Sequence, residues 1–292
     1  MRRVSCELRK RQVDNADAIA RMVAVAAAFA TAPKRNCMTA AYGQRLLSKD
    51  MEGDDVTELQ IRLAGFRGTV PDGQFGAGTE LQVQKFQQDF MAMARPTRVV
   101  DAATYRAIDA FAARHPIDFE QLKCRCGTCG GFGSGKFRGR FQPGGEGREI
   151  ANLYEYSGVH RMLLWAVRAA FFYMPEHKFS FSSAYRCSVD NQQHQRNTTN
   201  HHGKAVDLDI ALAPNESKRD DRDKCDAVRG RLVELSDAQI GWGAKNRKSL
   251  EPSDIAPTWV HYDVREYEPK YLRDEFFCRD LAGLNKAMPI AV

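Results

Sequence analysis

The first half of the chain carries apolar residues at helical spacing in three separate stretches. They recur every three or four positions between residues 54 and 63, and the same period returns at 83–90 and 105–108. This spacing places the apolar side chains on one face of each helix. The inward positions are Val56, Leu59, Leu63, Val83, Phe86, Phe90, Tyr105 and Ile108. Residues 43–112 are therefore predicted to form a small domain of three helices.

Turn and cap residues indicate where these helices begin. Between the first two helices, residues 70–76 contain Asp72-Gly73, and glycine permits the positive φ angle that a tight turn needs. Thr79 is followed three residues later by Gln82, which matches a capping box and predicts that the second helix opens at Thr79. Asp101 marks the start of the third helix.

The second half of the chain combines a helix with alternating strands. A helical apolar period runs from 156 to 174, and alternation of apolar and polar residues follows at 179–184, 205–212 and 258–264. We expect residues 116–292 to form a second domain with a central antiparallel sheet and flanking helices. The fold class is then α+β, with residues 1–42 as a separate N-terminal segment.

The N-terminal segment allows two interpretations. Basic residues crowd the first twelve positions, an apolar run covers 22–32, and Ala-Thr-Ala precedes Pro33. This order is typical of a secretory signal. Asp14 and Asp17, between the basic residues and the apolar run, argue against it, and the apolar spacing also fits one face of an Ala-rich helix. Both interpretations stay open.

Net charge and hydropathy limit the classes of partner that the chain is expected to bind. The chain has 43 Lys and Arg residues against 37 Asp and Glu residues, a net charge of +6, without a dense Lys/Arg block. This mild excess favours a polyanionic partner such as an acidic cell wall, and we expect no nucleic-acid partner. The sequence lacks an uncharged apolar stretch of about 18 residues, so no stable membrane insertion is expected.

Cysteine usage leaves the redox compartment undecided. Of the eight cysteines, three crowd into the segment Cys124-Arg-Cys126-Gly-Thr-Cys129. Such a cluster fits a redox pair, a disulfide, buried thiols, or part of a structural metal site with a fourth ligand elsewhere. These alternatives stay open.

Histidine and aspartate gather on the later strands. His201 and His202 precede a strand on which Asp207 and Asp209 must share a face, because strand side chains alternate. Two carboxylates on one face are costly to bury unless a cation offsets their charge. His261 lies on a further strand, and a set of three His and Asp ligands with one open position is what a catalytic zinc requires.

The helical region resembles a known family. The order Gly53-Asp-Asp-Val-x-x-Leu-Gln-x-x-Leu, then Asp72-Gly-x-Phe-Gly-x-x-Thr, then Val83-x-x-Phe-Gln is similar to the three-helix peptidoglycan-binding module of cell-wall hydrolases. The resemblance implies binding of glycan strands or stem peptides beside the turn. Asp72, Gly73 and Phe75 are then candidate substrate-binding residues, and peptidoglycan is the expected partner.

The second half resembles the zinc D-alanyl-D-alanine carboxypeptidase family, which includes VanY-like enzymes and phage endolysin peptidases. The landmarks are Ser183-x-Tyr-Arg-Cys-x-x-x-Asn191, the His-Gly-Ala-Asp segment that ends at Asp207, and the Val-His-x-Asp strand. The resemblance implies a Zn²⁺ cofactor held by His201, Asp207 and His261. It also implies that Arg186 contacts the substrate or stabilises the oxyanion, and Tyr185 beside it is a further candidate substrate-binding residue.

Two features depart from the family pattern. The usual histidine position, three residues before the glycine, is Asn200, so the first ligand is His201 or His202. Relatives place a Glu or His two or three residues before the last ligand, whereas this chain has Thr258 and Trp259 there. Asp263 and Asp254 are the remaining candidates for the catalytic base, and Asp263 could equally orient His261.

We therefore expect a monomeric zinc metallopeptidase that cleaves peptidoglycan stem peptides or cross-links, as a D,D-peptidase or an L-Ala–D-Glu peptidase. It would act in the periplasm or cell wall, after synthesis in the host cytoplasm in the case of a phage-encoded enzyme. The alternative is a non-catalytic peptidoglycan-binding protein with a degenerate peptidase domain, which the Asn200 departure motivates.

Overall fold

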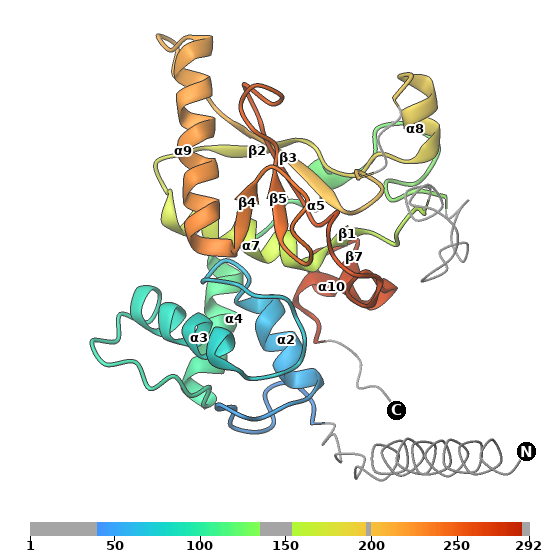
Figure 1. Ribbon diagram of the computed structural model, residues 1–292. Helices are drawn as coiled ribbons and strands as arrows, with labels where there is room; N and C mark the ends of the chain where they lie inside the picture. The colour runs from blue at the N-terminus through green and yellow to red at the C-terminus, as the bar shows by residue number, and fades with distance from the viewer. Residues whose placement is uncertain (1–39, 135–153, 197–199, 288–292) are drawn as a thin grey trace, which may run out of the picture. The chain divides into compact units, whose positions relative to one another are not determined.

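The computed structural model describes residues 40–134, 154–196 and 200–287, which belong to one compact unit. The expected N-terminal helix or secretory signal lies outside the described residues. Within the described ranges, no helix is long and apolar enough to cross a membrane. The fold is α+β, with a helical domain first and a sheet-containing domain second (Figure 1).

Three helices make up the first domain, as the apolar spacing predicts. They are α2 (Asp54–Arg62), α3 (Ala77–Asp89) and α4 (Ala102–Arg114). Their shared core is aromatic, since Phe66 packs edge-on against both Phe86 and Phe111 at ring distances of 5.0 and 5.2 Å. Asp101 caps α4 by accepting a hydrogen bond from the Thr104 amide at 2.8 Å. The predicted N-terminus of this helix is confirmed.

The predicted capping box of the second helix is wrong. α3 begins at Ala77 with Gly76 as its N-cap, and no side chain caps it. The Thr79 hydroxyl instead accepts a hydrogen bond from Gln60 Nε2 at 2.9 Å, and Gln82 Nε2 donates to the Leu63 carbonyl at 3.3 Å. Both side chains are buried against α2, so tertiary contacts override the local capping pattern.

The second domain is built on a five-stranded sheet in the order β2-β3-β6-β5-β4. Its neighbouring strands are antiparallel except for β4 and β5, which run parallel. The strands are β2 (Phe179–Ser183), β3 (Ala205–Ile210), β4 (Ala238–Ile240), β5 (Lys248–Leu250) and β6 (Val260–Asp263). A separate antiparallel pair joins β1 (Val159–His160) to β7 (Phe277–Cys278).

One long helix packs on this sheet, and a second packs against that helix. α9 (Lys218–Ser236) contacts β3, β4 and β6, and it also contacts α7 (Arg161–Tyr173). The predicted helix at 156–174 starts later than expected, because residues 159–160 pair as β1 and His160 Nδ1 accepts from the Met162 amide. The shorter elements are α5 (Phe119–Leu122), α8 (Ser188–Gln193), α10 (Leu281–Asn285) and 3-10 turns at Pro269–Tyr271 and Asp274–Phe276.

A buried ion pair joins the two domains. Arg161 at the start of α7 makes two hydrogen bonds to the Glu58 carboxylate on α2, at 2.8 and 2.9 Å. Arg62 donates to the same carboxylate at 2.6 Å, and all three side chains are at most 4% exposed. Removing one partner of a buried ion pair typically costs about 3–5 kcal/mol. The full chain is therefore the right unit for experiments.

Candidate metal centre

The candidate site begins with the register between two central strands. β3 pairs with β6 so that Asp207 lies directly opposite His261. Side chains at such opposed positions leave the sheet on the same face, with Cβ atoms about 4.5–5.5 Å apart. Asp207 Oδ1 lies 2.7 Å from His261 Nδ1, and both side chains are buried.

His201 reaches the same carboxylate from the turn that precedes β3. Its Nε2 lies 3.4 Å from Asp207 Oδ2, and its Nδ1 lies 2.7 Å from the carbonyl oxygen of Ala184. Because a carbonyl only accepts, Nδ1 carries a proton, and Nε2 is the nitrogen that faces Asp207 and that a metal ion could bind. The turn requires Gly203, whose φ is +120° and where a Cβ would meet the Gly158 carbonyl oxygen at 2.3 Å.

The neighbouring His202 points away from this carboxylate. Its Nε2 lies 3.2 Å from the side-chain amide nitrogen of Asn191. Between the two histidines that the sequence leaves open, the structure places His201 beside Asp207 and His261.

The three clustered side chains shift one another's protonation. Burial raises the pKa of Asp207, but hydrogen bonds and charge from His201 and His261 outweigh it and hold that pKa well below its usual value. Burial lowers the pKa of His261, yet its hydrogen bonds to Asp207 and Asp263 raise it to about 9. Burial lowers the pKa of His201. The cluster by itself therefore holds a proton on His261, which a metal ion would displace.

Asp263 lies behind His261, not in front of it. Its carboxylate is fully buried, and Oδ2 lies 2.9 Å from His261 Nε2 and 2.6 Å from Arg265 Nε. An acid held this way orients the imidazole through the nitrogen that does not face Asp207. Of the two roles that the sequence allows Asp263, the geometry fits the orienting role and gives it no access to a reacting water.

The structure brings a different acid to the site. Asp254, the other candidate base, is exposed on a turn and does not line the cleft. Glu251 does line it, with Oε1 4.0 Å from His261 Nε2 and 3.4 Å from Arg265 Nη2. Glu251 follows β5, which pairs with β6, so sheet pairing places it next to His261 across ten residues of sequence. Only the pairing of these strands could have signalled this residue.

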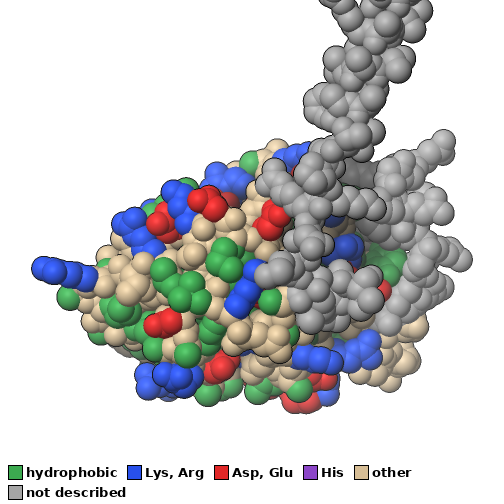
Figure 2. All heavy atoms as spheres, turned by 90° about the horizontal axis from the view of Figure 1, so that it is seen from below, with side chains coloured by type: hydrophobic (Ala, Val, Ile, Leu, Met, Phe, Trp, Pro, Cys, Tyr) green, Lys and Arg blue, Asp and Glu red, His purple; other side chains and the backbone are tan. Residues whose placement is uncertain are grey.

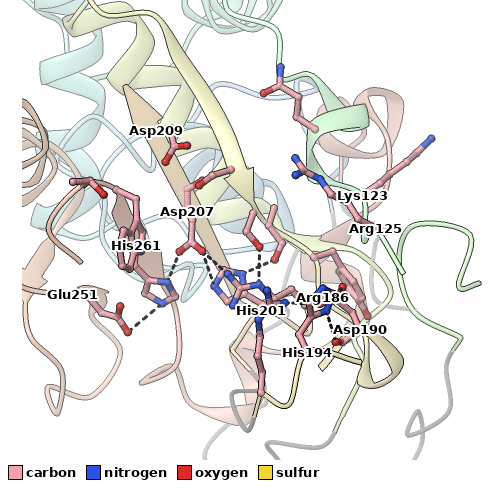
Figure 3. A pocket seen from close by; sticks show the side chains of 18 of the residues that line it. Lys123, Arg125, Arg186, Asp190, His194, His201, Asp207, Asp209, Glu251 and His261 are labelled. Atoms are coloured by element: carbon pink, nitrogen blue, oxygen red, sulfur yellow. Dashed lines mark hydrogen bonds and ion pairs between the residues drawn. The ribbon is translucent and has the colours of Figure 1, made fainter. Parts of the chain in front are cut away.

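The cluster opens into a cleft of about 820 Å³. Figure 3 shows Asp207 between the two histidines, with Glu251 beside His261 and Arg186 beside His201. The predicted common face of Asp207 and Asp209 is confirmed, since both line this cleft. Basic side chains also line the cleft: Lys123, Arg125, Arg186 and Arg196.

Arg186 donates directly to a member of the cluster. Its Nη2 lies 2.7 Å from Asp207 Oδ2, and its Nε donates to Ser183 Oγ at 2.7 Å. Tyr185 is less available than the resemblance implies, because its side chain is 2% exposed and its hydroxyl donates to the Tyr156 carbonyl at 2.7 Å. Tyr185 therefore forms the wall of the cleft, whereas Arg186 can reach a ligand.

The donor set fits zinc. His201, Asp207 and His261 each offer one ligand atom, and these atoms lie within 4.8 Å of one another. Two imidazole nitrogens and one carboxylate oxygen are ligands that catalytic zinc accepts, with a further position left for water or substrate. The outer partners are present as well, Ala184 on His201 and Asp263 on His261.

The residues expected to bind the wall occupy three different environments. Phe75 is 1% exposed in the core, so its ring cannot meet a ligand, contrary to expectation. Gly73 is buried with φ +75°, and its amide donates to Gln60 Oε1 at 2.9 Å. Asp72 is exposed, although its Oδ1 accepts from Gln60 Nε2 at 2.8 Å. Of the three, only Asp72 presents a side chain at the surface.

The helical domain has a hollow at a different place. It measures about 400 Å³ and is lined by Tyr42, Gly43, Arg62, Ala102, Tyr105, Arg106 and Asp109. On the face displayed in Figure 2, Lys and Arg side chains are interspersed with Asp and Glu. That mixture agrees with the mild net charge and with the absence of a Lys/Arg block in the sequence.

Comparison with known families identifies the helical domain. The family model of a peptidoglycan binding domain matches residues 52–108, which span α2, α3 and most of α4. A search of curated proteins found no match for the chain. Peptidoglycan is therefore a supported partner, and the match supports an association with the cell wall.

Proposed function

We propose that the chain is a zinc-dependent peptidase that cleaves stem peptides or cross-links of peptidoglycan. The observation that carries the proposal is the cluster of His201, Asp207 and His261 at a cleft, in a chain whose first domain matches a peptidoglycan-binding family. A buried His₂Asp set with oriented imidazoles serves metal chemistry better than it serves stability, because burying such groups without a cation is costly.

His201, Asp207 and His261 would hold the metal ion. When bound, zinc lowers the pKa of a water molecule and polarises a carbonyl group. The chain's own residues must then move the proton and hold the substrate. Asp263 keeps the His261 ring in place by accepting from Nε2, so Nδ1 stays directed at the Asp207 side of the site.

Glu251 is the proposed general base. Glu251 lines the cleft and lies on the Nε2 side of His261, with Oε1 4.0 Å from that nitrogen and within reach of Arg265, so it must turn toward the Nδ1 side of the ring to act as the base. A carboxylate in that position can accept a proton from water and deliver it to the leaving amine. Such a group typically contributes about 10²–10⁴-fold to the rate.

Basic side chains of the lining can bind the carboxylates of a peptide, and they stand among five acidic side chains that line the same cleft. Stem peptides carry several carboxylates, and the cleft presents Arg186, Arg196 and Lys123 around the cluster. The Arg186 guanidinium keeps its charge and offers a planar fork of donors for a carboxylate or a developing oxyanion. The lining does not select among D,D-, cross-link and L-Ala–D-Glu bonds, so we propose the substrate class and not a single bond.

Mass spectrometry of digested muropeptides tests the proposal. The full chain, loaded with zinc, should convert muropeptides into shorter stems or separated cross-links, and the mass change identifies the bond. A chelator should stop the reaction, and added zinc should restore it. If the zinc-loaded protein pulls down with insoluble peptidoglycan but leaves every muropeptide mass unchanged, the non-catalytic wall-binding alternative is correct.

A further inference from the structure

A second cluster of metal-ligating side chains lies outside the proposed active site. The structure brings the Sγ atoms of Cys124, Cys126, Cys129 and Cys187 within 4.8 Å of one another. The first three belong to the cysteine loop, residues 123–131, and the fourth comes from the N-cap position of α8. No cysteine lines the cleft among the residues that the structure describes.

We propose that these four cysteines bind a structural zinc ion. Zinc holds four thiolates at about 2.3 Å in a tetrahedron, which separates neighbouring sulfurs by about 3.8 Å. The Sγ atoms of Cys126 and Cys187 lie 3.5 Å apart, near that value. A disulfide requires about 2.05 Å and joins two sulfurs, whereas here four thiols converge on a common point.

Backbone amides already point at the sulfurs. The Cys187 amide donates to Cys124 Sγ, the Thr128 amide to Cys126 Sγ and the Asp190 amide to Cys187 Sγ, each at 3.4 Å. Donors aimed at ligand sulfurs are the outer shell expected around metal-bound thiolates. Because every ligand position is filled by protein, the site has no opening for water and its role is structural.

Two glycines let the backbone of the cysteine loop bring its thiols together. Gly127 and Gly130 have φ angles of +75° and +65°, and they flank Thr128 and Cys129. Left-handed backbone at these points lets a short chain turn back on itself, which places several amides on one side.

The proposed ion would tie the substrate side of the cleft to the rest of the domain. Cys187 directly follows Arg186, and the Tyr185 amide donates to the Leu122 carbonyl at 3.0 Å. A metal ion bridging the cysteine loop and α8 would therefore hold the segment 185–188 in place. This proposal does not depend on peptidase activity, since the two clusters share no ligand.

Cobalt substitution tests the site without measuring activity. The full chain, reduced and reconstituted with Co²⁺, should show the near-ultraviolet charge-transfer absorption of thiolate-bound cobalt. Cys126→Ser should lose that absorption and bind one metal ion fewer per chain, whereas Cys225→Ala, a buried cysteine outside the cluster, should keep both. His261→Ala should also keep the thiolate absorption, which separates this site from the proposed active site.

A second measurement uses only the wild-type protein, so it tests the site even if Cys126→Ser does not fold. Native wild-type protein is alkylated with and without a metal chelator, and the modified cysteines are mapped by mass spectrometry. The four cysteines should be protected until the chelator is added. Mapping of a disulfide between any two of them, or thiolate absorption absent from the wild-type cobalt protein, overturns the proposal.

Discussion

The cysteine cluster and the His/Asp cluster of the second domain differ in their donor atoms and in their access to the cleft. His201, Asp207 and His261 present mixed nitrogen and oxygen donors to a cleft of about 820 Å³. The four cysteines are all sulfur donors, drawn together by loops, and none of them lines that cleft. An open mixed set leaves room for a substrate, whereas a closed thiol set leaves none. Ligand type and access to solvent, not the number of ligands, distinguish the candidate catalytic metal site from the candidate structural metal site.

The two clusters also differ in what holds them. The register of β3 with β6 places Asp207 against His261, so the sheet sets their positions before any metal binds. The cysteine loop has little regular structure, and its position depends on a few amide contacts. Metal removal should therefore leave the first cluster's backbone in place and loosen the second.

Loss of His261 should produce the largest effect on activity. His261→Ala removes one ligand of the proposed zinc ion, so muropeptide cleavage should fall by more than the roughly 10²–10⁴-fold that loss of a general base costs. One metal ion should be lost while the thiolate-cobalt absorption remains. His194→Ala is the matched control, because His194 lines the same cleft outside the cluster. Full activity and full metal content in His261→Ala would show that the site lies elsewhere.

Substitution of Glu251 should separate proton transfer from metal binding. Glu251→Gln keeps the shape of the side chain but cannot accept a proton, so turnover should fall about 10²–10⁴-fold with metal content unchanged. Rates and metal analysis should be measured in parallel with Asp254→Asn. If Asp254→Asn is the inactive variant and Glu251→Gln is active, the exposed turn closes over the substrate and Asp254 is the base.

Arg186 lies between the two clusters and should affect turnover alone. Arg186→Ala removes a donor fork from the cleft, and loss of one such donor typically costs about 10²–10³ in kcat. Both metal ions should stay bound, because Arg186 is not a ligand in either cluster. A variant that folds, keeps its metal and cleaves at the parent rate would reduce Arg186 to a structural partner of Asp207.

The smallest expected effect is the pH dependence of zinc binding at the His/Asp cluster. In the metal-free fold the pKa of His261 is raised to about 9, so below that pH a metal ion must displace a proton from it. Zinc affinity of the His/Asp site should therefore rise about tenfold per pH unit up to about pH 9 and then level off. The stability of the metal-free fold changes with pH in the opposite direction. The raised pKa stabilises it fully below pH 6.5, and this contribution is lost as the pH rises through about 9.

Calorimetry of zinc binding at several pH values, on protein whose thiol site is already loaded, measures this dependence. The same measurement on Asp263→Asn provides the comparison, because this variant removes one of the two acceptors that hold the proton on His261. A zinc affinity that is flat between pH 7 and about 9 would contradict the raised pKa of His261.

Local patterns in the sequence determined the elements and much of the chemistry. Apolar spacing predicted α2, α3 and α4, and alternation predicted β2, β3 and β6 within a few residues of their bounds. Alternation also placed Asp207 and Asp209 on one face. These inferences succeed because helical and strand periods are properties of neighbouring residues, so no distant contact is needed to read them.

Tertiary structure decided everything that depends on distant partners. Strand pairing chose Glu251 over Asp254 as the acid in the cleft, and it buried Asp263 behind His261. The turn at Gly203 directed His201 toward Asp207 and His202 toward Asn191, a choice that two adjacent histidines cannot reveal. Cys187 joined the cysteine loop across 58 residues of sequence counted from Cys129. Each outcome rests on which strands pair and which loops meet, and long-range packing sets these, because no local period encodes them.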